Sequence, residues 1–202
     1  MHEVEPALQD ATITVLREQG WDGLTLERVA EVAAAPLSEP ALDLASAAWA
    51  ALRADEPGGL GAIARTPDPV LRFLAEAFDR LGREYPSTRD GLSLTERRIL
   101  AAVAAGASTA GAVFAAVGLR EARPFLGDTY CFRMIARLAS ARTPLLAVAA
   151  RVELTAAGRR VLDGADDHVG LSGIDRWVGG VHLAGAASAW RWHEGTEAIV
   201  PG

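Results

Sequence analysis

Residues 91–162 carry the clearest secondary-structure signals of the chain and read GLSLTERRILAAVAAGASTAGAVFAAVGLREARPFLGDTYCFRMIARLASARTPLLAVAARVELTAAGRRVL. In this segment Ser93 is followed three residues later by Glu96, which is the spacing of a helix-capping box. A first helix is therefore expected to begin at Ser93, and Gly106 is placed to end it.

Two further helices are expected to follow. Either Ser108 or Thr109 is placed to cap the second helix, and Asp128, which follows a glycine, is placed to cap the third. Arg133 and Arg137 lie four residues apart in the third helix, so both should point outward on one face. The other face of that helix is apolar and consists of Cys131, Met134, Ile135 and Leu138.

The end of the segment predicts two short strands and a helix. Residues 145–148 and 152–154 are apolar, and the three residues between them, which end in Arg151, suit the turn of a hairpin. Thr155 follows the second strand directly and is placed to begin a helix. Three helices, two strands and a helix in this order are the elements of a winged helix-turn-helix.

The rest of the chain predicts more helices and a β-rich tail. Residues 6–35 read as two helices, and further helices are expected at residues 42–53, 60–64 and 69–84. In the tail, residues 177–183 and 189–192 are expected to pair as a hairpin, with residues 198–200 as a third strand.

The expected fold class is mainly α with a small β component. It consists of a helical N-terminal part, a central winged helix-turn-helix and a C-terminal β-hairpin. Three regions are expected, namely a helix-turn-helix-like segment at residues 1–54, a helical connector and winged-helix core at residues 55–162, and a β-rich tail packed on the core at residues 163–202.

Composition restricts the class of protein. The 202 residues are 50% hydrophobic, which is enough for a core, and Cys131 is the one cysteine, so an intramolecular disulfide is excluded. No apolar run approaches the length of a membrane-spanning helix, and the first residues do not resemble a signal peptide. We therefore expect a cytoplasmic protein with no membrane association.

Charge is distributed unevenly along the chain. The net charge of −6 divides into −8 for residues 1–82, +6 for residues 83–162 and −4 for residues 163–202, and every basic residue is an arginine. The positive charge therefore coincides with the predicted winged helix, where a basic face would suit phosphate binding. Alternatively, these arginines are solvated or are paired with the acidic flanks.

The expected function is a DNA-binding transcriptional regulator, a homodimer that responds to an unidentified small-molecule effector. Arg133 and Arg137 would face the groove or its phosphates, Arg151 would lie at the tip of the wing, and Arg97 and Arg98 would contact the DNA backbone. The alternative is a protein-interaction or ligand-sensing module that has the winged-helix shape without DNA binding.

Arginines and aromatic residues alternate in the tail. They form a candidate ligand or stacking cluster of Arg176, Trp177, His182, Trp190, Arg191 and Trp192. Alternatively, Trp190 and Trp192 face one side of a strand and pack on the helical body.

The sequence lacks recognised patterns for catalysis and for cofactor binding. It contains no Gly-x-Ser-x-Gly elbow and no phosphate-binding loop, and His168, His182 and His193 make no recognised metal-ligand pair. We therefore expect no enzymatic activity, no cofactor and no metal site.

Residues 11–30, ATITVLREQGWDGLTLERVA, resemble the start of tetracycline-repressor-type transcriptional regulators, over about residues 6–35. In that family a Leu-Thr pair begins the helix-turn-helix, and the next helix enters the major groove. Here that helix would be residues 37–48, which contain Glu39 and Asp43 but no arginine, lysine, asparagine or glutamine. Because carboxylates repel phosphates, we predict that residues 6–54 serve packing or dimerisation rather than base reading.

A second resemblance covers about residues 36–200. Residues 123–128 (RPFLGD), 154–159 (LTAAGR) and 173–183 (GIDRWVGGVHL) are similar to motifs in the C-terminal half of a bacterial family of unknown function. Members of that family usually carry a separate N-terminal domain, in whose place the repressor-like helices stand here. The resemblance implies a shared fold, and it supplies neither an activity nor catalytic residues.

Overall fold

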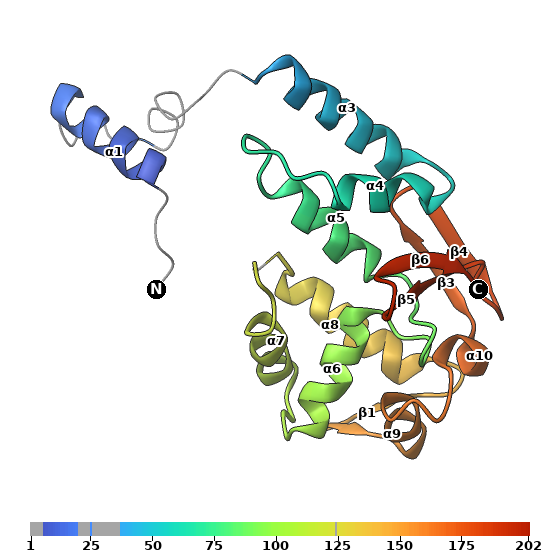
Figure 1. Cartoon of the computed structure of the whole chain (residues 1–202). Helices are drawn as coiled ribbons and strands as arrows, with labels where there is room; N and C mark the ends of the chain where they lie inside the picture. The colour runs from blue at the N-terminus through green and yellow to red at the C-terminus, as the bar shows by residue number, and fades with distance from the viewer. Residues whose placement is uncertain (1–5, 20–24, 26–36, 124) are drawn as a thin grey trace. The chain divides into compact units, whose positions relative to one another are not determined.

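The computed structural model describes residues 6–19, 25, 37–123 and 125–202, and it is mainly helical with small two-stranded antiparallel sheets (Figure 1). The chain forms two compact units, residues 1–42 and residues 43–202. No helix in the described residues is both long and apolar enough to cross a membrane.

The first unit contains helix α1 (Pro6–Gln19), whose buried face includes Ala11 and Val15, four residues apart. The second helix that was predicted in this part of the sequence lies outside the described residues. Helix α3 (Glu39–Arg53) begins in the first unit and continues into the second. The helix predicted at residues 42–53 is therefore confirmed, with three more residues at its start, whereas the helix that the repressor resemblance implied at residues 37–48 starts two residues later and ends five residues later than expected.

The second unit begins with helices that the sequence predicted in part. A 3₁₀ turn at Pro57–Gly59 leads into α4 (Leu60–Ala64), which is confirmed, whereas α5 (Leu74–Gly82) is shorter than the helix predicted at residues 69–84. The predicted helix begins too early in the sequence. At its expected N-terminal end, Asp68 Oδ1 accepts hydrogen bonds from the backbone N–H groups of residues 70 and 71, at 2.8 and 2.7 Å. This local bonding holds the chain in a turn instead of a helix.

The central elements follow in the predicted order. They are α6 (Leu94–Ala104), α7 (Ala110–Gly118), α8 (Asp128–Ser140), β1 (Leu146–Val148), β2 (Val152–Leu154) and α9 (Ala156–Leu162). Strands β1 and β2 pair as the predicted antiparallel hairpin.

Side-chain caps explain where the central helices begin. Ser93 Oγ accepts from Glu96 N at 3.2 Å and Glu96 Oε2 accepts from Ser93 N at 2.8 Å, which confirms the capping box. Thr109 and Thr155 cap α7 and α9 through their side chains, which accept from Ala112 N and Gly158 N. The prediction that Asp128 caps α8 is wrong, because the N-cap is the preceding glycine and Asp128 is the first helical residue.

The central elements enclose a hydrophobic core. The predicted apolar face of α8 is confirmed, because Cys131, Met134, Ile135 and Leu138 are all buried in this core. Gly158 allows α9 to pack closely, since a Cβ at this position would lie 2.1 Å from the carbonyl oxygen of Leu145.

The tail contains one short helix and two hairpins. Helix α10 (His168–Ser172), which was not predicted, is capped by Asp167, whose side chain accepts from Gly170 N. The hairpins are β3 (Ile174–Val178) with β4 (Val181–Gly185), and β5 (Trp190–His193) with β6 (Ala198–Pro201).

The predicted pairing of residues 177–183 with residues 189–192 is wrong. The chain turns at Gly179 and Gly180, inside the segment that was expected to be one strand, and Gly179 has a φ of +61° that glycine adopts without strain. The predicted third strand is confirmed as β6, and β5 pairs with it. The single C-terminal hairpin of the expected fold class is therefore two hairpins.

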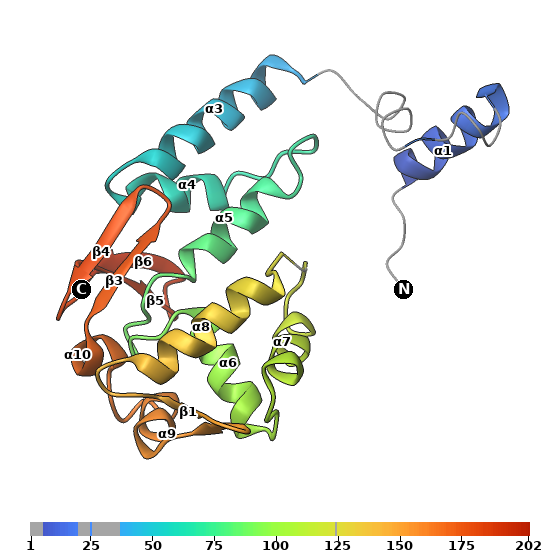
Figure 2. The same ribbon diagram turned by 180° about the vertical axis from the view of Figure 1, so that it is seen from behind.

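A second hydrophobic cluster joins α3, α4 and α5 to the two tail hairpins, with Phe78, Tyr85 and Trp192 among its buried members. In both views of the second unit, α4 and α5 lie beside the tail hairpins at one end, whereas α9 and β1 lie at the other (Figures 1 and 2). Helices α6 and α8 lie between these ends.

Candidate functional site

Helix α8 presents the two arginines that the sequence placed on its outer face. Arg133 and Arg137 are exposed, one turn apart, and opposite the buried face of the helix. Arg137 Nη2 donates to the backbone oxygen of Asp175 at 3.0 Å. Arg133 has no hydrogen-bond or ion-pair partner within the described part of the chain. Figure 2 shows α8 in front of α6, with β1 below it.

Two further arginines lie near this helix. Arg151 is exposed in the turn between β1 and β2, as predicted, and its Nη2 donates to Ser108 Oγ at 3.0 Å. Arg142, which the sequence analysis did not single out, follows α8 directly and is also exposed. Its Nε and Nη2 donate to the backbone oxygen of Leu171 at 2.9 and 2.6 Å.

Arg97 and Arg98 occupy a different environment on α6. Arg97 Nη2 lies 2.9 Å from Oδ1 of the fully buried Asp90, and Arg97 Nη1 lies 2.7 Å from Glu194 Oε1. Arg98 Nη1 lies 2.5 Å from Glu121 Oε1. Both arginine side chains are less than one-fifth exposed, so each is held inside the protein by a carboxylate.

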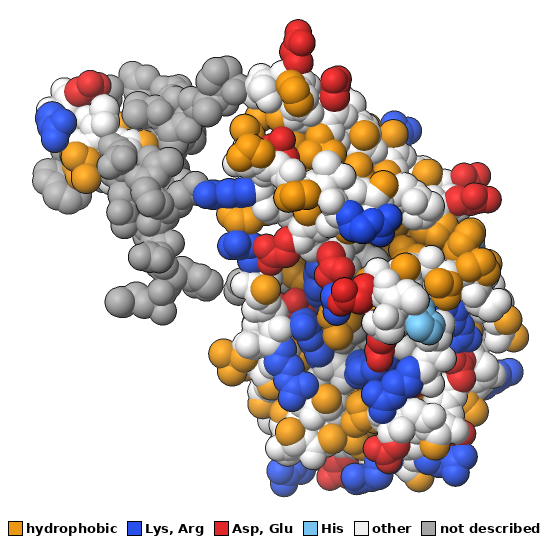
Figure 3. All heavy atoms as spheres, viewed as in Figure 1, with side chains coloured by type: hydrophobic (Ala, Val, Ile, Leu, Met, Phe, Trp, Pro, Cys, Tyr) orange, Lys and Arg blue, Asp and Glu red, His pale blue; other side chains and the backbone are white. Residues whose placement is uncertain are grey.

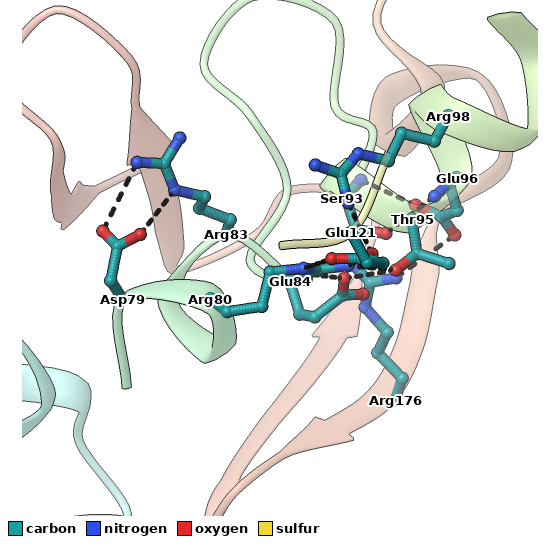
Figure 4. Close-up of polar contacts among 10 residues, drawn as sticks. All are labelled: Asp79, Arg80, Arg83, Glu84, Ser93, Thr95, Glu96, Arg98, Glu121 and Arg176. Atoms are coloured by element: carbon teal, nitrogen blue, oxygen red, sulfur yellow. Dashed lines mark hydrogen bonds and ion pairs between the residues drawn. The ribbon is translucent and has the colours of Figure 1, made fainter. Parts of the chain in front are cut away.

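Glu121 is the centre of an ion-pair network that joins α5 to α6 (Figure 4). Arg80 donates two hydrogen bonds to Glu121, from Nε to Oε2 at 3.0 Å and from Nη2 to Oε1 at 2.8 Å. Burial by itself would raise the pKa of Glu121, but the contacts with Arg80 and Arg98 outweigh it and lower that pKa. Arg80 also donates to Glu84 Oε1 at 2.6 Å, which extends the network to the residues that follow α5.

A second part of the network ties the tail to α6. Arg176 on β3 lies 3.2 Å from Glu96 through Nη1 and donates through Nη2 to the backbone oxygen of Glu84 at 2.7 Å. Burial would raise the pKa of Glu96, but the guanidinium of Arg176 contributes most to lowering it instead. The predicted tail residue Arg176 therefore has one structural partner on α6 and one just after the end of α5.

Every half-buried arginine of the basic segment has a carboxylate partner, whereas the exposed arginines are paired in only two cases in the described part of the chain, Arg123 and Arg160. Within residues 83–162, the arginines that have no carboxylate partner among the described residues are all exposed, namely Arg89, Arg120, Arg133, Arg137, Arg142, Arg151 and Arg159. The paired ones include every arginine of this segment that is half-buried. On the face viewed in Figure 3, basic and acidic side chains are interspersed.

The structure places the aromatic residues of the candidate tail cluster in two separate environments. Trp177 is 66% exposed and stacks on His182 with ring centroids 4.6 Å apart, and His182 Nε2 lies 2.9 Å from Asp175 Oδ1. Trp190 and Trp192 instead pack in the second hydrophobic cluster, as the alternative interpretation predicted. The cluster therefore does not form one site.

The other tail arginine is also used internally. Arg191 Nη1 contacts Asp167 Oδ2 and donates to the backbone oxygen of Ser87 at 3.2 Å, so it links β5 to the residue that caps α10. Burial would raise the pKa of Asp167, but the hydrogen bond from Arg191 helps to lower it.

The second unit contains two notable cavities. The larger, about 440 Å³, lies between α4, α5 and the β5–β6 hairpin, with Trp190 and Trp192 in its lining. Its carboxylates Glu76, Asp79 and Glu197 are each paired with an arginine, so they offer little uncompensated charge. The smaller, about 220 Å³, is lined by residues of α6, α8, α10 and β3, and it includes Arg137.

Neither a metal-binding group of side chains nor a match to a known protein indicates what the site does. The described residues contain no group of three or more histidine, cysteine, aspartate or glutamate side chains placed to hold a metal ion. Comparison of the chain with family models, with curated proteins and with solved structures found no match.

Proposed function

We propose that the chain is a non-catalytic DNA-binding regulator in which residues 93–162 form a winged helix-turn-helix. In this proposal α8 docks on DNA and the β1–β2 hairpin is the wing. The observation that carries it is the exposure of Arg133, Arg137 and Arg151, which have no carboxylate partner among the described residues.

Exposed arginines are the ones that can exchange their present contacts for phosphates at little cost. The hydrogen bonds of Arg137 to a backbone oxygen and of Arg151 to Ser108 are solvent-exposed, so water or phosphate can replace the acceptor. Arg133 and Arg137 lie one turn apart on α8, which suits adjacent phosphates or one guanine edge.

The proposed contact set differs from the one expected from the sequence. Arg97 and Arg98 are left out, because Arg97 is paired with the buried Asp90 and Arg98 is one of the two arginines paired with the buried Glu121, so moving either of them to DNA would break a buried ion pair. Arg142 is added, since it is exposed directly after α8 and its acceptors are backbone oxygens.

DNA binding by the wild-type protein and by Arg133→Ala/Arg137→Ala should be titrated over a range of salt concentrations. Each arginine that contacts a phosphate should contribute about one unit to the slope of log affinity against log salt, so the double variant should lose about two. Arg159→Ala, an exposed α9 arginine without a carboxylate partner in the described residues, is the matched control and should keep the wild-type slope. A double variant that binds DNA as the wild type does would contradict the proposal.

A second candidate function is a protein-interaction module with the same shape. The exposed aromatic side chains around the start of α8 favour it. Phe125 is 58% exposed, Tyr130 is 50% exposed and Phe132 is 39% exposed. Aromatic residues and arginine are enriched in protein interfaces. If the wild-type protein shows no salt-dependent DNA binding at low ionic strength, this second function replaces the first.

We also propose that residues 6–54 provide dimer contacts rather than base contacts. Glu39 and Asp43 are exposed on α3 and carry the charge that DNA repels. Sedimentation of the full chain and of a chain without residues 1–36 would test this, with loss of the dimer expected on truncation.

A further inference from the structure

The cavity of about 220 Å³ beside α8 brings together polar and charged side chains from four elements. Its lining includes Glu96 of α6, Arg137 of α8, His168 and Ser172 of α10, and Arg176 of β3. These residues are distant in sequence, and their convergence depends on the packing of the tail against the central helices.

Two residues of this lining have a buried polar atom without a hydrogen-bond partner in the described structure. The atoms are His168 Nδ1 and Arg176 Nε. Buried polar groups are nearly always satisfied by protein, by water or by a ligand, so two such atoms beside one cavity indicate a polar occupant. Burial lowers the pKa of His168, so its ring is neutral at pH 7 and can donate one hydrogen bond.

The lining carries two arginines and two carboxylates, so the case for an anion depends on which of these groups is already paired inside the protein. Glu96 is already compensated, because its carboxylate contacts Arg176 Nη1 at 3.2 Å and accepts from Ser93 N at 2.8 Å. Asp175 also lines the cavity, but its carboxylate is 86% exposed and lies beside His182. Arg137 has no carboxylate partner in the described residues, so it is the uncompensated charge of the cavity.

We propose that this cavity binds a small oxyanion, a carboxylate or a phosphate, held by Arg137, Arg176 and His168, and that the bound anion competes with DNA for Arg137. The anion site stands on the cavity alone, whereas the competition rests on the proposed DNA-binding function. An anion of this kind would be the effector of the regulator.

The first experiment measures anion binding without DNA. Acetate, succinate and inorganic phosphate are titrated separately into the full chain at constant ionic strength, and the histidine ring signals are followed by NMR. We expect saturable binding of at least one of these probes, with a shift of the His168 signals. The preferred probe identifies the anion as a carboxylate or a phosphate.

Two variants test the assignment of the site. His168→Leu removes a ring that makes no hydrogen bond within the described residues, so the fold should persist while anion affinity falls by about tenfold or more. His193→Leu, on β5 and outside the lining, is the matched control and should bind as the wild type does. Non-saturable binding of all three probes, or equal affinity in wild type and His168→Leu, would overturn the anion site.

The second experiment measures the salt slope of DNA binding with and without a saturating amount of the bound probe. Occupation should lower the slope by about one unit in the wild type and should have no further effect in Arg137→Ala. An unchanged wild-type slope would overturn the competition. If the wild type binds the anion but not DNA, the anion site stands and the proposed regulator function, with the competition, is rejected.

Discussion

Helices α6 and α8 each carry a pair of arginines beside the same hydrophobic core, and the two pairs have different environments. On α6, Arg97 and Arg98 are mostly buried and end on carboxylates. On α8, Arg133 and Arg137 are exposed and have no carboxylate partner among the described residues. The comparison shows that the net charge of a segment overestimates the charge that a nucleic acid can reach.

The position of each helix explains the difference. The connector before α6, the loop after α7 and the tail bring Asp90, Glu121 and Glu194 within reach of the arginines of α6. Helix α8 directs its apolar face to the core, and the neighbour that Arg137 meets is a backbone oxygen of β3. Taking an arginine out of water requires a charged partner, whereas an exposed arginine needs none.

The largest expected effect comes from breaking the network on the α6 side. Glu121→Gln removes the charge that Arg80 and Arg98 share, and the Glu121 side chain is only 3% exposed. Because two half-buried guanidinium groups would lose their common partner, the free energy of unfolding should fall by about 3 kcal/mol. Urea denaturation would measure this loss.

Glu153→Gln provides the matched control, because Glu153 is exposed on β2 and has no ion-pair partner in the described structure. Its effect should stay within about 0.5 kcal/mol. A loss of less than about 1 kcal/mol in Glu121→Gln would mean that the network contributes little, and the contrast between the two helices would weaken.

An intermediate effect is expected in acid. The pKa of Glu121 is lowered in the folded state, so its ion pairs stabilise the fold fully above the unfolded pKa of about 4.3. This contribution is lost as the pH falls through the lower folded pKa. The free energy of unfolding, measured from pH 7 to pH 3, should therefore decline less steeply in Glu121→Gln than in the wild type.

Asp90 has the opposite effect on the pH dependence of stability, because burial raises its pKa. Asp90 is present in both the wild type and Glu121→Gln. The difference between the two pH profiles thus isolates Glu121. Parallel profiles would show that the carboxylate is no better stabilised in the fold than in the unfolded chain.

The smallest effect on stability is expected on the α8 side. Arg133→Ala/Arg137→Ala removes one exposed hydrogen bond, from Arg137 to the backbone oxygen of Asp175, so the free energy of unfolding should change by less than about 1 kcal/mol. Thermal and urea denaturation of the double variant would check this. A loss above about 2 kcal/mol would give these arginines a structural role and would remove the distinction from α6.

Signals that act over a few residues were readable from the sequence. The capping box of Ser93 and Glu96, the caps at Thr109 and Thr155 and the apolar face of α8 all formed as expected. Local chemistry also explains the failures, because the Asp68 side chain replaced a predicted helical turn and the turn at Gly179 and Gly180 divided a predicted strand.

The sequence by itself therefore determined the order of the central elements and the outward face of α8, since both depend on spacing along the chain. The tertiary structure decided which arginines have distant carboxylate partners: Arg80 and Glu121 are 41 residues apart, and Arg123 and Glu76 are 47 apart. The same packing buried Trp190 and Trp192 away from the exposed Trp177, and it assembled the cavity that Arg137 and His168 line. The sequence gives the position of each charged residue along the chain. Whether that residue is buried beside a carboxylate depends on how the chain packs in three dimensions.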